Sequence, residues 1–154
     1  EKISISSLYF ENKNEVKKLV KEVGAQSVSV TIDIKKIDNQ YFIFTKNGNF
    51  NTNKKPLELI EEISDIAGEI VINNIDLDGT MTGPDHQIIS QIYKKIKIPL
   101  VIIGGIGEID DIIKLCNKYD LIGVACGSLF IYKGKNNAVL INYPIEKIRK
   151  KIIN

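Results

Sequence analysis

The stretch Pro99–Ile112, "PLVIIGGIGEIDDI", contains three local patterns in succession. After its proline, Pro99–Ile103 is wholly aliphatic, which is typical of a strand that is buried on both faces. A glycine-rich turn, Gly104–Gly107, follows, and Glu108–Tyr119 is predicted to be a helix, with acidic residues in its first turn, where they suit the helix dipole. The stretch therefore predicts one β-α unit.

The same unit recurs on both sides of this stretch. Further parallel strands are predicted at Lys2–Ser6, Ser27–Ile37, Glu69–Ile75 and Leu121–Ala125, and further helices at residues 11–23, from Pro56, at 85–97 and at 144–153. Tyr41–Thr45 follows an Asp38-Asn39 turn and is predicted to form a hairpin with the strand before it. Together with Pro99–Ile103 this makes five parallel strands joined by helical crossovers, an α/β pattern.

Two architectures suit five such units. A (β/α)8 barrel typically needs ~250 residues, so 154 residues make a little over half of one, and an open doubly wound sheet is the alternative. The glycines favour the barrel, because Gly104–Gly107 follows the fourth parallel strand and Gly127-Ser128 the fifth, and barrels commonly bind phosphate on the loops after strands 7 and 8. We therefore expect residues 1–154 to form a single partial domain, the C-terminal half (strands 4–8) of a (β/α)8 TIM barrel, with the N-terminal half missing from this chain.

The composition argues against several classes of protein. Apolar residues make up 44% and charged residues 26%, and the net charge of +2 is too small to indicate nucleic-acid binding. No segment is long and apolar enough to predict a membrane span. Cys116 and Cys126 lack C-x-x-C spacing, so we expect free thiols in a reducing cytoplasm. No group of residues has metal-ligand spacing, and neither a metal nor a cofactor is expected.

Asp33 interrupts the apolar part of its strand, "VTIDIKK". An aspartate in such a position is unfavourable unless it is paired or lies at an exposed strand end. It suits a general acid/base at the C-terminal mouth of a barrel strand, and it equally suits a structural residue that bonds a neighbouring loop. The residues themselves leave both interpretations open.

The segment Asp76–Thr80, "DLDGT", matches the D-x-D-G-T nucleophile motif of haloacid-dehalogenase-type phosphatases. In those enzymes the motif ends the first strand, whereas here at least two β-α units precede it. Turn chemistry is the alternative, because Asp-Gly is a favoured turn pair. We therefore expect a rim at the barrel mouth, which holds a phosphate rather than cleaving one.

Four segments, taken in order and at this spacing, resemble the cyclase subunit of imidazole glycerol phosphate synthase, a (β/α)8 barrel of histidine biosynthesis. They are "QSVSVTIDIKK" (26–36), "GEIVINNIDLDGTMTGPD" (68–85), "PLVIIGGIGEIDDI" (99–112) and "GVACGSLF" (123–130). The tail "GSLFIYKGKNNAVLINYP" (127–144) is similar to cyclase paralogues of bacterial surface-polysaccharide clusters, which are thought to supply ammonia for amidation of sugars. The resemblance implies a lyase that uses ammonia to cleave and cyclise a bisphosphorylated ribulotide.

The resemblance also implies roles for individual residues. Asp33 matches the catalytic general acid/base of strand 5, whose partner aspartate lies on a first strand that this chain does not contain, and Asp76 matches an acid that shapes the mouth. In the family, a few positions hold one phosphate of the substrate. The residues that match or adjoin those positions here are Gly79, Gly104, Gly105, Gly127 and Ser128. Lys2 and Glu69 match two members of a charged ring that gates ammonia from a glutaminase partner; two unrelated surface charges are the alternative.

Several positions depart from the family pattern. Asn73 replaces a threonine, Ile103 replaces a serine beside the phosphate loop, and Gly83-Pro84 is more similar to the sister sugar isomerase of the same pathway. The open hypotheses are therefore the histidine enzyme, the polysaccharide-cluster paralogue, a phosphoribosyl isomerase and a non-catalytic ammonia conduit. Taken alone, the 154 residues are expected to be inactive and to self-associate through open strand edges.

Overall fold

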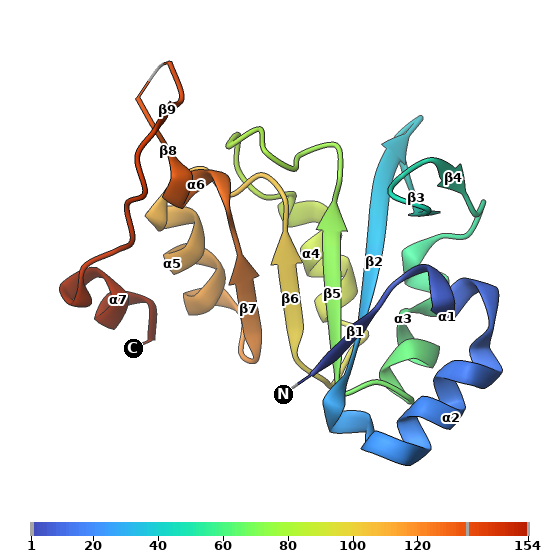
Figure 1. Cartoon of the computed structure of the whole chain (residues 1–154). Helices are drawn as coiled ribbons and strands as arrows, with labels where there is room; N and C mark the ends of the chain where they lie inside the picture. The colour runs from blue at the N-terminus through green and yellow to red at the C-terminus, as the bar shows by residue number, and fades with distance from the viewer. Residues whose placement is uncertain (1, 135, 154) are drawn as a thin grey trace.

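Five parallel strands lie side by side in the order in which they occur along the chain (Figure 1). The computed structural model describes residues 2–134 and 136–153. The parallel strands are β1 (Ile3–Ile5), β2 (Val28–Ile37), β5 (Glu69–Asn74), β6 (Leu100–Ile103) and β7 (Ile122–Ala125). A doubly wound sheet would reverse its strand order at a switch point, and this one does not. The fold is therefore the partial (β/α)8 barrel that the sequence predicts.

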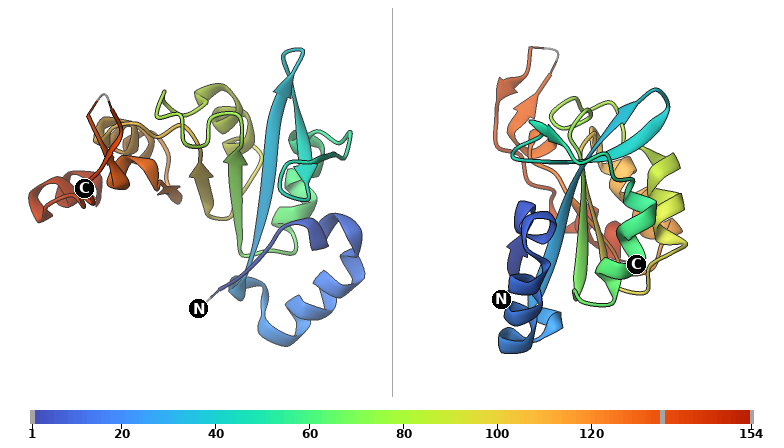
Figure 2. Two further views of the ribbon diagram at one scale, coloured as in Figure 1. Left: turned by 45° about the horizontal axis from the view of Figure 1, so that its top comes forward. Right: turned by 90° about the vertical axis from the view of Figure 1, so that its right-hand side faces the viewer.

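Helices cover one face of this sheet. The three that stand behind it in Figure 1 are α3 (Pro56–Ser64), α4 (His86–Tyr93) and α5 (Ile109–Lys118). Each presents buried aliphatic side chains to the strands, chiefly Ile60, Ile63, Ile88, Ile92 and Leu115. In the right-hand view of Figure 2, β1 and the hairpin strands Tyr132–Lys133 and Ala138–Val139 lie on the side of the sheet opposite to these three helices, whereas the last helix, Glu146–Ile153, contacts α5. The sheet is thus curved, and α3, α4 and α5 lie on its convex side.

Side chains alternate along each strand between the helix face and the concave face. On β2, Val30, Ile32 and Ile34 are fully buried under the helices, whereas Thr31 and Asp33 face the concave side and are only partly buried. We call the concave-facing residues of β2, β5, β6 and β7 the inner wall. The strand register assigns to it Ser29, Thr31, Asp33, Glu69, Val71, Asn73, Val101, Ile103, Gly123 and Ala125.

The predicted hairpin is present, and its second strand pairs with the part of β2 that β1 does not reach. β3 (Gln40–Thr45) pairs antiparallel with the upper part of β2, while β1 pairs with its lower part. Asp38 and Asn39, with φ angles of 46° and 62°, make the two-residue turn that such hairpins favour. The segment 46–54 contains a further short strand, β4 (Phe50–Asn51), which pairs with the end of β3.

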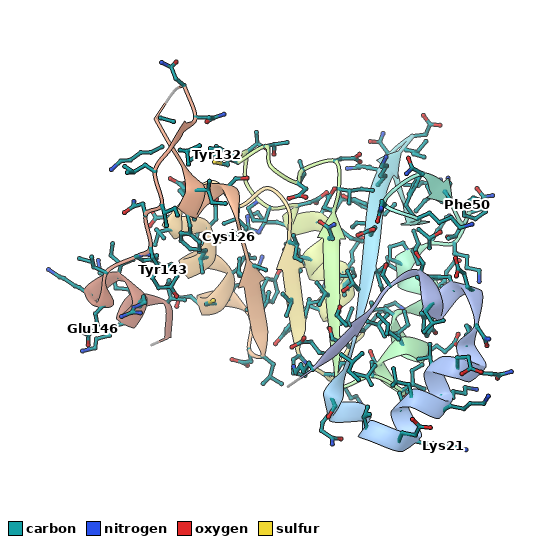
Figure 3. All side chains as sticks on the ribbon, in the orientation of Figure 1. Lys21, Phe50, Cys126, Tyr132, Tyr143 and Glu146 are labelled. Carbon is teal, nitrogen blue, oxygen red and sulfur yellow. The ribbon has the colours of Figure 1, made fainter. Side chains whose placement is uncertain are left out.

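The remaining elements lie at the two ends of the sheet. After β1 come α1 (Ser7–Glu11), α2 (Lys13–Val23) and a 3-10 turn, η1 (Ala25–Ser27). After β7 come α6 (Ser128–Ile131), the short hairpin of β8 (Tyr132–Lys133) and β9 (Ala138–Val139), and α7 (Glu146–Ile153). Val139, Ile141 and Tyr143 in this last region are well exposed, and Figure 3 labels Tyr143 beside the chain that leads to α7.

Candidate functional site

A pocket with an empty volume of about 260 Å³ lies at the carboxyl ends of β5, β6 and β7. The loops that follow these strands meet at the upper end of the sheet in Figure 1. The pocket is lined by Asp78, Gly79, Met81, Ile103, Gly104, Gly105, Ile106, Ala125, Cys126, Gly127 and Ser128. Five residues predicted to bind phosphate (Gly79, Gly104, Gly105, Gly127 and Ser128) therefore come from three separate loops to one place. Their role in binding stays a prediction.

Gly104 and Gly105 have a packing role that the sequence did not reveal. Their φ angles of +100° and +87° lie in the left-handed region, and a Cβ at either position would collide with backbone carbonyls of the preceding βα loop. The collision would be with the carbonyl of Asn74 for Gly104 and with that of Gly83 for Gly105. In return, the amide of Gly83 donates a 2.7 Å hydrogen bond to the Gly105 carbonyl. These glycines therefore fix the loop after β5 against the loop after β6.

The opposite wall of the pocket is more open. The position of a Cβ on Gly79 would have only the Ser128 Oγ near it, at 4.0 Å, and the space beside Gly127 is empty to that distance in the described structure. Cys126 lines the same pocket, and Figure 3 labels it at the upper end of β7. Burial raises the pKa of its thiol, so the sulfur is protonated at neutral pH. The wall thus offers backbone amides, one hydroxyl and an uncharged thiol.

Asp33 lies on the inner wall, on β2, which is the neighbour of β5, and the loop after β5 lines the pocket. Asn73, its register partner on β5, donates a hydrogen bond of 2.9 Å from Nδ2 to Asp33 Oδ1. The bond sets the orientation of the carboxylate. In the sequence, Asn73 was recognised only as a departure from the family pattern. Like Asp33, however, it is a polar residue that interrupts an apolar strand, and this could have marked it as a site residue.

Asp76 is on the rim, but its carboxylate turns away from the pocket. Its Oδ2 accepts a hydrogen bond of 2.8 Å from the backbone amide of Lys36, at the upper end of β2. Its own amide donates to Asn74 Oδ1 at 3.3 Å. Asp78, two residues later, is the aspartate of "DLDGT" that lines the pocket. Asp76 therefore joins two strand ends, whereas Asp78 lines the pocket, and a role of Asp76 toward substrate stays a prediction.

Lys2 and Glu69 meet at the other end of the sheet. Glu69 opens β5 on the inner wall, and its Oε2 accepts a hydrogen bond of 2.5 Å from Lys2 Nζ. The glutamate side chain is 17% exposed and the lysine side chain 45%. The two residues that the resemblance assigns to a gate thus form an ion pair, at the amino ends of the strands and remote from the pocket.

The described residues offer no other obvious chemistry. Within residues 2–134 and 136–153, no three His, Cys, Asp or Glu side chains are grouped so that they could hold a metal ion. In that same part of the chain, no helix has both the length and the apolar character to cross a membrane. The acidic pair Asp110-Asp111 lies in the first turn of α5, where Asp111 accepts hydrogen bonds from the amides of Gly107 and Glu108. Asp111 therefore caps the helix.

The fold and the arrangement of these loops define a protein of the (β/α)8-barrel type with a pocket at the carboxyl ends of β5, β6 and β7. The chain belongs to the histidine biosynthesis protein family, whose sequence model matches residues 1–137.

Individual relatives agree with this assignment. The chain is 45% identical to "Putative imidazole glycerol phosphate synthase subunit HisF" of Leptospira borgpetersenii, over 94% of its own length and 58% of the relative's. It is 43% identical to "Putative imidazole glycerol phosphate synthase subunit hisF3" of Vibrio vulnificus (strain YJ016), over 99% of its own length and 60% of the relative's. It is 38% identical to "Imidazole glycerol phosphate synthase subunit HisF" of Sulfolobus acidocaldarius, over 78% of its own length and 49% of the relative's. The chain spans about three fifths of the length of the first two relatives.

Proposed function

We propose that this chain is part of a cytoplasmic cyclase subunit of the imidazole glycerol phosphate synthase type. The observation that carries the proposal is that Gly79, Gly105 and Ser128, on three different loops, line one pocket at the same barrel mouth as Asp33. The substrate of such a cyclase is a bisphosphorylated ribulotide. One of its phosphates would lie in the pocket and its reacting atoms over the inner wall.

In this proposal Asp33 acts as general acid/base. Asn73 holds its Oδ1, so that Oδ2 is the oxygen that exchanges a proton with substrate. Backbone amides of the glycine loops and the Ser128 hydroxyl would stabilise the phosphate by hydrogen bonds, because hydrogen bonds to an anion are shorter and stronger than neutral ones. The protein supplies position and charge, which is what ring closure on a mobile, phosphorylated chain requires.

The complete active site would include residues outside these 154. We propose that the chain is one partial barrel domain and that a second catalytic aspartate belongs to the other half. Ammonia would come from a glutaminase subunit, enter at the Lys2–Glu69 ion pair and cross the barrel to Asp33. Opposite charges at 2.5 Å can close such an entrance and open it by rotation of the lysine side chain.

A second candidate is a paralogue that supplies ammonia for amidation of sugars in surface-polysaccharide synthesis. The favouring observation is that Asn73 and Ile103, which both depart from the family pattern, are register partners beside Asp33 on the inner wall. Both replacements thus alter the surface on which the reacting part of a substrate would lie.

The decisive experiment uses the full-length protein that contains this chain, with ammonium chloride as nitrogen source and the aminoimidazole-carboxamide ribulotide as substrate. Asp33→Asn should lower turnover by roughly 100-fold or more, the usual contribution of a general acid/base. Its affinity for inorganic phosphate, measured by calorimetry, should stay the same. Asp110→Asn is the matched control, since that carboxylate lies in the first turn of α5 and does not line the pocket.

Each outcome selects one hypothesis. Retained turnover in Asp33→Asn contradicts the assignment of Asp33. Isomerisation of a phosphoribosyl substrate without ammonia would indicate the sister isomerase. If the unsubstituted protein neither cyclises nor isomerises, but product formation by a separate synthetase depends on Lys2 and Glu69 and not on Asp33, the protein is an ammonia conduit. Ammonia-dependent consumption of a different, sugar-derived substrate would identify the paralogue.

A further inference from the structure

The side-chain amide of Asn73 on β5 is held in one orientation. Its Nδ2 donates the 2.9 Å hydrogen bond to Asp33 Oδ1 across the β2–β5 pair. If the amide were turned over, Oδ1 would face a carboxylate oxygen, and two acceptors would oppose each other without a hydrogen between them. The carbonyl oxygen of the Asn73 side chain, Oδ1, is therefore directed away from Asp33.

This Oδ1 atom is buried and has no hydrogen-bond partner in the described part of the chain. The neighbours of Asn73 on the inner wall are aliphatic. They are Ile103, its register partner on β6, and Val71, two residues earlier on the same face of β5. A buried acceptor without a donor is unfavourable, and native proteins rarely keep one without a reason. The amide thus presents a fixed acceptor that is available to a ligand over the inner wall.

The next residue, Asn74, has the same side chain on the opposite face of β5, where it is 6% exposed. Its Oδ1 accepts a hydrogen bond of 3.3 Å from the backbone amide of Asp76. The fold therefore supplies a donor for the asparagine that faces the helices. For the asparagine that faces the inner wall, residues 2–134 and 136–153 supply none.

We propose that Asn73 is a specificity-determining residue, whose Oδ1 accepts a hydrogen bond from an N–H or O–H group of the substrate beside the atom at which Asp33 transfers a proton. The inference rests on the proposed function. Asp33 Oδ2 and Asn73 Oδ1 flank the bond between the two side chains, so together they select a substrate with two neighbouring donors, such as a pair of hydroxyls or an amino group. A substrate without such donors would leave Oδ1 buried and unpaired, which is the usual basis of strong discrimination.

The test measures binding rather than turnover, in the full-length protein that contains this chain. Asn73→Leu keeps the size of the side chain and removes its donor and acceptor, and Asn73→Ala removes them without adding bulk. Asn117→Leu is the matched control, because it makes the same exchange at an exposed position of α5, away from the inner wall. Calorimetry gives the dissociation constants of the aminoimidazole-carboxamide ribulotide and of inorganic phosphate, in the parent and in an Asp33→Ala background.

We expect both Asn73 variants to bind the ribulotide roughly tenfold more weakly, the effect of about one lost hydrogen bond, with Asp33 present or replaced. Their affinity for phosphate should match that of the parent, which shows that the fold is intact, and Asn117→Leu should match the parent for both ligands. Unchanged ribulotide affinity overturns the inference. A loss that disappears in the Asp33→Ala background also overturns it, since Asn73 would then act through Asp33 alone. A parent that binds phosphate but not the ribulotide overturns the proposed function first, and this inference with it.

Discussion

The hydroxyl of Tyr41 on β3 donates a hydrogen bond of 2.5 Å to Oδ2 of Asp85, the residue that caps α4. Asp85 Oδ1 meanwhile accepts hydrogen bonds from the amides of Gln87 and Ile88. One carboxylate therefore ties the β2–β3 hairpin to the start of the helix that covers the middle of the sheet. Burial, and then the Asp85 carboxylate, raise the pKa of Tyr41 far above its ordinary value.

We expect Tyr41→Phe to lower the free energy of unfolding at pH 7 by about 1.5 kcal/mol, as for a hydrogen bond to a charged group. Because the folded protein holds Tyr41 protonated, its contribution is complete below about pH 10 and decreases above that pH, where the unfolded tyrosine ionises. Urea unfolding from pH 9 to 11 should show the parent losing about 1.4 kcal/mol per pH unit more than Tyr41→Phe above pH 10. If the free energies of unfolding of the parent and of Tyr41→Phe change with pH in parallel, the hydrogen bond from Tyr41 to Asp85 is contradicted.

Gly104→Ala should destabilise the fold, whereas Gly127→Ala should not. At Gly104 a Cβ would meet the Asn74 carbonyl at a φ of +100°, so we expect a loss of about 2 kcal/mol or more. At Gly127 φ is −104° and the described structure leaves the space open, so the change should stay within about 0.5 kcal/mol. Thermal unfolding of both variants is the measurement, and equal losses would show that the two loops are not packed as described.

The Lys2–Glu69 ion pair should contribute little to stability. A pair with one largely exposed partner is usually worth about 1 kcal/mol or less, so a double-mutant cycle of Lys2→Met and Glu69→Gln should give a coupling within that limit. In the full-length protein the same variants should change glutamine-dependent turnover more than ammonium-dependent turnover. A coupling above about 2 kcal/mol would instead make the pair a structural one.

Residues 1–154, produced alone, should self-associate. β7 is hydrogen bonded to β6 and has its other edge free in the described structure, and the inner wall next to it is only partly buried. Val101→Lys, which places a charge in the middle of that wall, should shift the mass measured by light scattering toward the monomer. A parent chain that is monomeric at all concentrations would contradict this prediction.

The sequence predicted well those features that depend on local pattern. Asp33 interrupts an apolar strand and was therefore expected to be paired or exposed, and it is paired with Asn73. The glycines after the last two strands lie at the pocket. The bond from Asn73 to Asp33 could not be predicted, because it depends on the register of strands 40 residues apart. The orientation of the Asp76 carboxylate toward the Lys36 amide could not be predicted for the same reason. Short strands such as β4 and β8 were not predicted, because a strand of two residues is too short to show an alternation of polar and apolar residues.

β2 is paired on both sides, with β5 along most of its length and with β1 and β3 in turn on the other side. Amide hydrogen exchange in its centre should therefore be among the slowest in the chain, while β7, with one free edge in the described structure, should exchange sooner. In residues 1–154 taken alone, we therefore expect Asp33 to lie on the strand whose amides exchange most slowly, and Ser128 to follow a strand whose amides exchange sooner.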